Sequence, residues 1–188
     1  MAEKISTVEF KEGFKDGIPI GLGYFAVSFA LGIAMKNAGL TALQGFFMSL
    51  FNLASAGEYA GTQVILSNGT YLQMAMMTLV ANARYLLMSC SLSQHIHPST
   101  STAHRLAIGY GVTDEIFGIE INRPLYTSPY YGYGAIAASA LPWCIGTSFG
   151  ILMGNVLPAR IVSALSVALY GMFLAIIIPP ARKDMAVM

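Results

Sequence analysis

Stretches without a charged side chain dominate this sequence and constrain its fold. Only 9 of the 19 charged residues lie between positions 17 and 181, where six runs of 19 or more residues carry no charge: 17–35, 37–57, 59–83, 85–104, 124–159 and 161–181. A helix that crosses about 30 Å of hydrocarbon needs roughly 20 mostly apolar residues. With 55% hydrophobic residues, a water-soluble fold could not cover so much apolar surface. The sequence therefore predicts an all-α, polytopic helical bundle embedded in a lipid bilayer.

Several classes of protein are excluded by the same composition. A net charge of +1 provides no basic field for nucleic acid. Cys90 and Cys144 lie in apolar surroundings and form no disulfide framework. The sequence has no phosphate-binding loop, no dinucleotide fingerprint and no zinc-ligand spacing, so we expect no cofactor and no metal.

Charge distribution divides the chain into three regions. Residues 1–16 hold seven charges of mixed sign and predict a cytoplasmic or interfacial arm, amphipathic or irregular, rather than a signal peptide. Residues 17–181 form the transmembrane region, and residues 182–188 form a charged tail. Lysines near the start and Arg182-Lys183 near the end favour a cytoplasmic position for both termini.

The apolar runs predict about five full spans with one or two half-crossing or broken helices. We expect four of the spans at 17–35, 71–92, 134–157 and 161–178. Pro19 is predicted in the first turn of the first span, which ends at the stop pattern 36–39.

Two regions are less regular. Residues 43–66 fit either one tilted helix or a span to about position 57 followed by a half-length helix, with Asn68-Gly69 as the next turn. Residues 106–121 are too short and polar for an ordinary span and predict a single short or half-crossing helix.

Charged residues inside apolar runs are the main functional signal. Such a residue at the bilayer centre costs at least about 2.5–3.5 kcal/mol on insertion scales. Glu58, Arg84, Asp114 and Glu115 therefore need an explanation. One interpretation is a path for a polar substrate or a proton. The other is a set of ion pairs, Arg84 with Glu58 or with Asp114, that only fix helix packing.

Glycines spaced four residues apart are the second signal. They occur at 146, 150 and 154, at 17 and 21, and at 57 and 61, and this spacing lets helix backbones approach closely. Around Glu58, Gly57 and Gly61 could alternatively permit a helix break that exposes backbone groups to a substrate.

Two apparent catalytic or metal patterns are accidental. Residues 146–150 match the G-x-S-x-G nucleophile elbow, but they lie in one apolar helix with no histidine after them. His95, His97 and His104 lie in a polar loop without metal-ligand spacing. We therefore expect no catalytic residues and no enzyme activity.

A weak internal repeat relates Ser28–Asn37 to Ser148–Asn155, with a gap of two residues. Transporters often contain such duplications around a shared site. Apolar sequence of low complexity also produces matches of this length by chance.

Four sequence blocks, at 10–20, 54–59, 82–88 and 111–117, together resemble the AzlC family of bacterial branched-chain amino acid permease subunits. The resemblance implies a multi-pass protein of the bacterial cytoplasmic (inner) membrane that exports branched-chain or related amino acids, usually with a small AzlD-type membrane subunit. It places Gly57, Glu58, Tyr59, Arg84, Asp114 and Glu115 on family motifs. Together with Gly61 and Asn82, these residues form the candidate site for a substrate or a proton path.

Two departures from the family pattern bear on that expectation. The family usually has Gln where this chain has Glu58, so the carboxylate could change the substrate or the proton coupling. Family members usually continue for some 50 more residues with further spans, which predicts a chain shortened at its C-terminus.

The sequence thus leads to two functional hypotheses. The first is a permease for a hydrophobic amino acid, driven by proton or substrate gradients and not by ATP. In it Arg84 and the helix N-termini at a Gly57–Gly61 break receive the substrate carboxylate, and Glu58 or Asp114 receives the ammonium group or a proton. The alternative is a non-transporting membrane subunit whose internal charges are assembly contacts.

Overall fold

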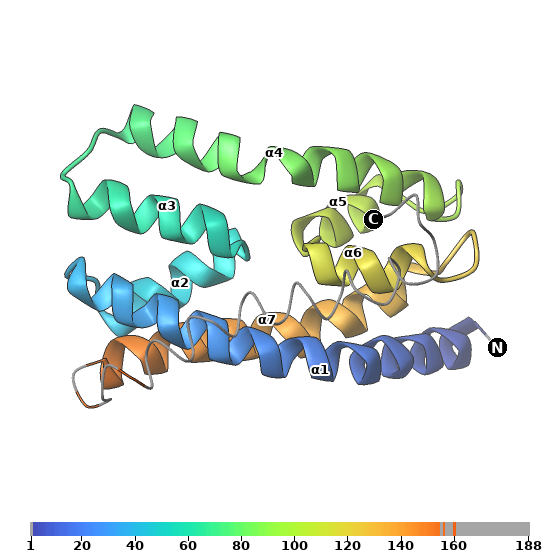
Figure 1. The fold of residues 1–188 in the computed structure, drawn as a ribbon. Coiled ribbons are helices and arrows are strands. Elements are labelled where there is room, and N and C mark those ends of the chain that lie inside the picture. Colours follow the sequence, from blue (N-terminus) through green and yellow to red (C-terminus); the bar gives the residue numbers. More distant parts are fainter. Residues whose placement is uncertain (1, 155, 157–159, 161–188) are drawn as a thin grey trace, which may run out of the picture.

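The computed structural model describes residues 2–154, 156 and 160. Within these residues, short connections join helices in the order α1 (Ala2–Asn37), α2 (Ala42–Asn52), α3 (Ser55–Leu66), α4 (Tyr71–His95), α5 (Thr102–Tyr110), α6 (Asp114–Ile121) and α7 (Pro129–Met153) (Figure 1). One isolated bridge, between Ile96 and Thr127, is the only β-pairing in this part of the chain. The predicted all-α fold is confirmed.

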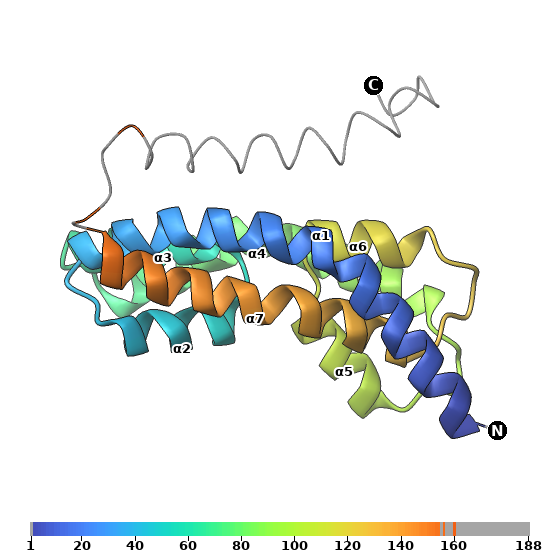
Figure 2. The same cartoon turned by 90° about the horizontal axis from the view of Figure 1, so that it is seen from below.

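Helices α1 and α7 form a central pair that lies side by side and runs in the same direction (Figures 1 and 2). Small residues make the contact. A Cβ added to Gly17 would lie 2.8 Å from the carbonyl oxygen of Ala135, and one added to Gly32 would lie 3.0 Å from Cα of Gly150. The two backbones therefore touch, which maximises dispersion contacts between them. We call this pair the spine.

The first helix begins earlier than its sequence predicts. Because α1 starts at Ala2, Pro19 lies inside the helix, and the prediction that Pro19 occupies its first turn is wrong. Proline in a helix interior removes one backbone hydrogen bond and bends the helix. Figure 2 shows the N-terminal part of α1 leaving the axis of the remainder.

The predicted helix stop and turn signals are confirmed. Helix α1 ends at Asn37, and Gly39 follows with φ +82°, a left-handed conformation that glycine adopts without steric cost. The Leu40 N–H closes the end by donating to the carbonyl oxygen of Met35 at 3.1 Å. Asn68 and Gly69 lie in the turn between α3 and α4.

Residues 42–66 adopt neither of the two predicted geometries. Helix α2 leads inward, the chain reverses at Leu53 and Ala54, and α3 returns toward the end from which α2 came (Figure 1). Leu53 has the left-handed φ of +43°, and Ala54 is extended. This re-entrant unit, residues 42–66, is the first hairpin.

A second hairpin, residues 102–121, enters from the opposite end (Figure 1). Helix α5 leads inward, the chain reverses at 111–113, and α6 returns, so the prediction of a single helix over 106–121 is wrong. The Tyr110 hydroxyl donates to the carbonyl oxygen of Leu50. The tips of the two hairpins therefore meet in the middle of the protein.

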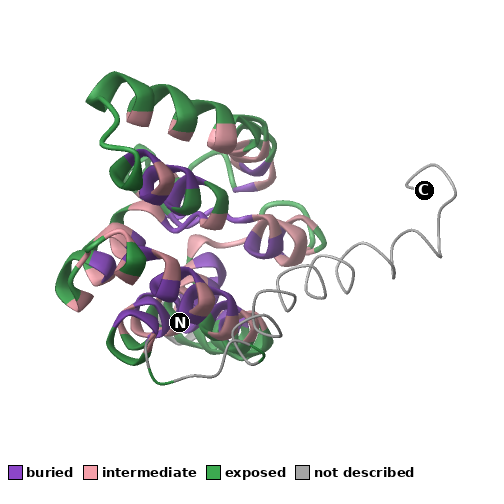
Figure 3. Ribbon diagram, turned by 60° about the vertical axis from the view of Figure 1, so that its left-hand side comes forward, coloured by how far each residue is buried: buried purple, intermediate pink, exposed green. Residues whose placement is uncertain are grey.

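The predicted helix over 71–92 is confirmed as α4, which runs opposite to the spine and packs on α3 and α6 (Figure 1). A capping box starts it: Thr70 accepts from the Gln73 backbone, and the Gln73 side chain accepts from the Thr70 backbone. Most of its surface is exposed (Figure 3), including Leu79, Val80 and Leu87. An exposed apolar helix of this kind fits contact with lipid or with another membrane helix.

Two of the described helices, Ser6–Asn37 of α1 and Pro129–Met153 of α7, are long and apolar enough to cross a membrane by length and composition. Helix α4 has the same length as α7, but the polar residues Asn82 and Arg84 interrupt its apolar sequence. The alternative of a span that continues to about position 57 is wrong, because α2 ends at Asn52 and the chain reverses before α3. The expected span at 161–178 and the tail at 182–188 lie outside the described residues.

The order of elements repeats itself. A long helix followed by a re-entrant hairpin occurs twice, first with α1 and then with α4, and α7 follows as a third long helix. Of the weak sequence repeat, residues 28–37 lie on α1 and residues 148–153 on α7, and the matched glycines Gly32 and Gly150 contact each other. The repeated segments therefore form equivalent faces of the spine.

The spine provides a stability prediction. We expect Gly150→Ala to lower the free energy of unfolding by about 1–3 kcal/mol, because the new methyl group overlaps the Phe29 carbonyl on α1. The matched control is Gly118→Ala, where nothing lies within 4 Å of the added carbon. Thermal unfolding in detergent should show a loss for the first variant and no loss for the second; equal effects would contradict close packing at Gly150.

Candidate functional site

Glu58 lies in the first turn of α3 and is completely buried, with 0% of its surface exposed. Its carboxylate accepts hydrogen bonds from the Ser49 hydroxyl of α2 at 2.8 Å and from Trp143 Nε1 of α7 at 2.7 Å. The Ser49 hydroxyl also lies 2.6 Å from that of Thr147. The Glu58 carboxylate and the Ser49 hydroxyl thereby attach the first hairpin to α7 of the spine.

The partners of this carboxylate are electrically neutral. Among the described residues, the side-chain ion pairs are Arg84 with Asp114 and Arg123 with Glu12, and neither involves Glu58. Burying an ionised carboxylate without a counter-charge is expensive, and two neutral donors offset only part of that cost. The Glu58 group is therefore suited to accept a positive charge, whether a proton or an ammonium group.

The second hairpin also carries carboxylates at the start of its returning helix. Thr113 caps α6 by accepting from the Ile116 N–H, and Asp114 and Glu115 follow in the first turn. Acidic side chains are favoured there because the N-terminal end of a helix is partially positive. The two hairpins thus present carboxylates at equivalent places near their tips.

The two acidic residues of α6 have different partners. Asp114 forms an ion pair with Arg84 of α4 at 2.8 Å, which resolves the predicted alternatives for Arg84 in favour of Asp114. Glu115 accepts from the Tyr24 hydroxyl of α1, which is also hydrogen-bonded to the Thr113 hydroxyl at 2.6 Å. Asp114 therefore connects α6 to α4, and Glu115 connects it to the spine.

Four side chains of this region were not in the sequence-based candidate set: Tyr24, Ser49, Trp143 and Thr147. Each is buried and polar, and each lies in an apolar run. Trp143 is the only tryptophan of the chain, and a buried indole N–H needs an acceptor. That requirement could have indicated Trp143 as a partner for a buried acid, whereas nothing in the sequence distinguishes Ser49 or Thr147 from other small polar residues.

Asn82, Gly57 and Asn52 come together beside the tip of the first hairpin. The Asn82 amide nitrogen donates to the Asn52 side-chain oxygen at 3.3 Å. A Cβ added to Gly57 would lie 2.6 Å from that same nitrogen. The Asn82 amide therefore occupies space that any larger residue at position 57 would need. The Asn82 oxygen is buried and has no hydrogen-bond partner among the described residues.

The remaining candidates of the first hairpin lie apart from the Glu58 carboxylate. The Tyr59 side chain is 54% exposed. Gly61 faces Met48 and Met74, which indicates close packing. The predicted break at Gly57–Gly61 is wrong, because both glycines lie inside α3 and the reversal occurs at Leu53–Ala54.

The chain reversal at Leu53–Ala54 leaves the start of α3 without a side-chain cap. The N-cap residue is Ala54, whose side chain has no oxygen to accept from the first N–H groups of the helix. These groups therefore provide a partially positive end next to the asparagine pair. The start of α5, with Ser101 as its N-cap, also has no side-chain cap, whereas the hydroxyl groups of Thr41, Thr70, Thr113 and Ser128 cap α2, α4, α6 and α7.

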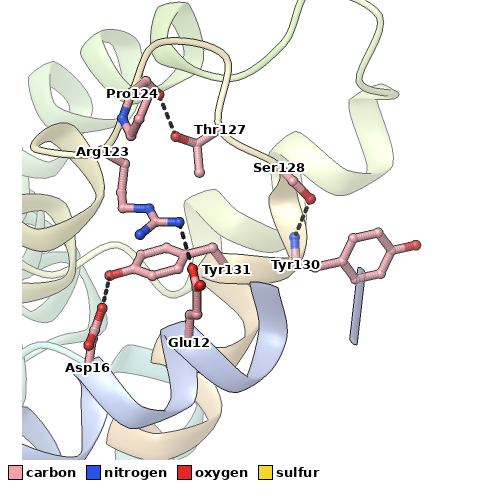
Figure 4. A network of polar contacts seen from close by, with 8 residues as sticks. All are labelled: Glu12, Asp16, Arg123, Pro124, Thr127, Ser128, Tyr130 and Tyr131. Atoms are coloured by element: carbon pink, nitrogen blue, oxygen red, sulfur yellow. Dashed lines mark hydrogen bonds and ion pairs between the residues drawn. The ribbon is translucent and has the colours of Figure 1, made fainter. Parts of the chain in front are cut away.

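A separate polar network connects the chain after α6 to the spine (Figure 4). Arg123 pairs with Glu12 of α1 at 2.9 Å and lies over the Tyr131 ring, 4.4 Å from its centroid. The Tyr131 hydroxyl donates to Asp16 at 2.9 Å. This network closes one end of the molecule and does not reach Glu58.

The three histidines have local partners. His95 bonds to the Arg123 carbonyl, His97 to Ser99 and His104 to the Tyr133 hydroxyl. Within the described part of the chain, no group of three or more His, Cys, Asp and Glu side chains is placed to hold a metal ion.

Long apolar helices, two opposed re-entrant hairpins and carboxylates at their tips are consistent with an all-α helical membrane protein. The sequence profile of the AzlC protein family matches residues 19–157, and the chain belongs to that family. This match includes every candidate site residue. No solved structure matches the chain.

Three relatives illustrate the family. The chain is 25% identical over 172 residues to an uncharacterized membrane protein of Archaeoglobus fulgidus, covering 90% of this chain and 75% of the relative. It is 28% identical over 151 residues to the inner membrane protein YgaZ of Escherichia coli, covering 78% and 61%. It is 24% identical over 178 residues to the branched-chain amino acid transport protein AzlC of Bacillus subtilis, covering 93% and 69%.

These relationships establish a membrane protein of a transport-related family rather than of an enzyme family. The chain spans only about three fifths to three quarters of the length of the three relatives.

The hydrogen bonds around Glu58 lead to a second prediction. Ser49→Ala should lower the free energy of unfolding by about 1–3 kcal/mol, because the buried Glu58 carboxylate loses a donor. Ser139→Ala is the control, since Ser139 is equally buried but bonds only within its own helix, to the Ala135 carbonyl. Thermal unfolding should separate the two variants, and a loss as large for Ser139→Ala would argue against a special role for Ser49.

Proposed function

We propose that this chain is a multi-pass permease subunit of the bacterial cytoplasmic membrane that exports branched-chain or related hydrophobic amino acids. The observation that carries the proposal is the buried Glu58 carboxylate, held by neutral donors at the tip of a re-entrant hairpin. Transporters bind substrates near the bilayer midplane at discontinuous helices of this kind. In this proposal residues 17–181 form the permease domain, between the arm at 1–16 and the tail at 182–188.

A zwitterionic substrate requires a negative and a positive partner. Glu58 supplies the negative one: an ammonium group beside it would replace the missing counter-charge and gain charge-assisted hydrogen bonds. In its protonated form the same carboxyl would release the ammonium group. Exchange of substrate for a proton at one carboxyl would couple export to the proton gradient without ATP.

The positive partner is the uncapped start of α3, one turn before Glu58. Its free N–H groups are suited to a carboxylate, and the amide groups of Asn52 and Asn82 lie beside it. Arg84 is a second candidate, but it is paired with Asp114. A substrate carboxylate would therefore bind Arg84 only while Asp114 is protonated or displaced.

The aliphatic part of the substrate would contact the apolar residues around the break. Leu53, Val27 and Leu31 belong to the buried cluster that also contains Tyr24 and Trp143. Branched aliphatic side chains such as those of valine and leucine gain the most free energy from such surroundings. This chemistry agrees with the printed name of the Bacillus subtilis relative, a branched-chain amino acid transport protein.

A small AzlD-type membrane subunit belongs to the same proposal. The exposed apolar surface of α4, with Leu72, Leu79 and Leu86, offers a face for a partner helix (Figure 3). Lipid would cover the rest of the apolar exterior.

Transport measurements test the proposal. In proteoliposomes, Glu58→Gln and Asp114→Asn should each reduce valine or leucine transport at least about tenfold, a loss of roughly 1.4 kcal/mol or more at the transport step. Glu12→Gln is the control, since Glu12 lies in the peripheral network and is exposed on the surface. If transport by both site variants equals that of the wild type, the assignment is wrong.

The alternative function is a membrane subunit that assembles with a partner and does not transport. The ion pair between Arg84 and Asp114 favours it, because this pair connects the exposed helix α4 to the second hairpin. In that case Arg84→Ala should abolish the complex with a small membrane partner.

Thermal stabilisation by amino acids separates the two functions. A permease should be stabilised by its substrate, by about 2.7 kcal/mol at 100 times the dissociation constant. An amino acid panel without any stabilisation, with and without the small partner, would favour the assembly function.

A further inference from the structure

Tyr24 and Trp143 form an aromatic pair inside the spine, between the two hairpin tips. Their ring centroids lie 5.2 Å apart with an interplanar angle of 72°, an edge-to-face contact. Both residues are buried, with 5% and 3% of their surface exposed. Tyr24 comes from α1 and Trp143 from α7, whose backbones are held together by the glycine contacts of the spine.

Each ring binds a different hairpin through its polar end. Trp143 Nε1 donates to Glu58 of the first hairpin at 2.7 Å, and the Tyr24 hydroxyl donates to Glu115 of the second. The two carboxylates thus belong to one continuous chain of contacts: Glu58, Trp143, Tyr24 and Glu115. Each carboxylate lies in the first turn of a returning helix.

We propose that Tyr24 and Trp143 are positioning residues that couple the two hairpins. A change of charge at Glu58 alters the hydrogen bond between Tyr24 and Glu115, and a change at Glu115 alters the hydrogen bond between Trp143 and Glu58. The inference rests on the proposed function, in which Glu58 gains and loses a positive partner. Because the hairpins enter from opposite ends, such coupling would loosen both hairpin tips together when Glu58 gains its positive partner.

The physical basis is the directionality of the two hydrogen bonds. When an ammonium group or a proton neutralises Glu58, the carboxyl becomes a weaker acceptor for the indole N–H. The indole ring is then free to tilt, and a tightly packed edge-to-face contact transmits the tilt to the Tyr24 ring. A small movement of that ring changes the alignment of its hydroxyl with Glu115 and weakens the bond.

The single tryptophan makes this coupling observable. Trp143 is the only tryptophan of the chain, so intrinsic tryptophan fluorescence reports on the surroundings of the indole ring that is hydrogen-bonded to Glu58. In the purified full chain, Glu115→Gln should shift the emission maximum of Trp143, although Glu115 has no direct contact with that ring. In the Tyr24→Phe background, Glu115→Gln should cause no further shift.

Asp16→Asn is the matched control for this experiment. Asp16 also accepts from a tyrosine hydroxyl within the spine, that of Tyr131, but it lies outside the chain of contacts. It should leave the emission of Trp143 unchanged. If Glu115→Gln leaves the emission unchanged, or shifts it equally with and without the Tyr24 hydroxyl, the coupling does not exist.

A second substitution keeps the test decisive if Glu115→Gln does not fold. Glu115→Asp retains the charge and withdraws the carboxylate by one methylene group from the Tyr24 hydroxyl. It should shift the emission in the same way. An unchanged emission would overturn the proposal.

Leucine titrations connect the coupling to transport and separate the two proposals. The dissociation constant of leucine is measured through Trp143 emission for Glu115→Gln, Tyr24→Phe and the double variant. The change in the double variant should differ by at least about twofold from the product of the two single changes. If the effects simply multiply, the coupling does not influence the binding site. If no amino acid alters the emission of any variant, the proposed substrate is wrong, while the Glu115→Gln shift still decides whether the hairpins are coupled.

Discussion

Close contact between α1 and α7 is the constraint on which the rest of the structure depends. Glycine on both helices allows the backbones to touch, and the parallel direction of the pair follows from the alignment of these contacts along both helices. The contacts of Glu58 with Trp143 and of Glu115 with Tyr24 both begin on this spine. Tyr24, Trp143 and Thr147 can hold the hairpin tips only because their own positions are fixed by the backbone packing beneath them.

The site itself balances burial against charge. Glu58 is withdrawn from solvent and has only neutral donors, whereas Asp114 is partly exposed and has a full counter-charge in Arg84. The carboxylates at the starts of the two returning helices thus have different electrostatic surroundings: neutral donors hold Glu58, and a guanidinium group pairs with Asp114.

Local signals predicted the long helices well and the hairpins poorly. Gly39 and Asn68-Gly69 determine backbone conformation through their own chemistry, so the ends of α1 and α3 could be predicted from them. The reversal at Leu53 contains no glycine and results from tertiary packing. Helix α1 continues through Pro19 because its contacts with α7 lie on both sides of that residue. The isolated charges identified Glu58, Arg84, Asp114 and Glu115, but the partnership of Glu58 with Trp143 joins residues 85 positions apart and leaves no local pattern.

The parallel direction of α1 and α7 has a consequence for sidedness. Both helices start at the same end of the molecule, and the connection between α4 and α5 lies at that end too (Figure 1). The end of α1 and the connection between α3 and α4 lie at the opposite end. The network of Glu12, Asp16 and Arg123 therefore lies at the same end of the molecule as the N-terminus. In a membrane crossed by α1, the compartment that holds either terminus of α1 would assign the connections at the two ends of the molecule to their aqueous phases, but not the reversals at 53–54 and 111–113 in its middle.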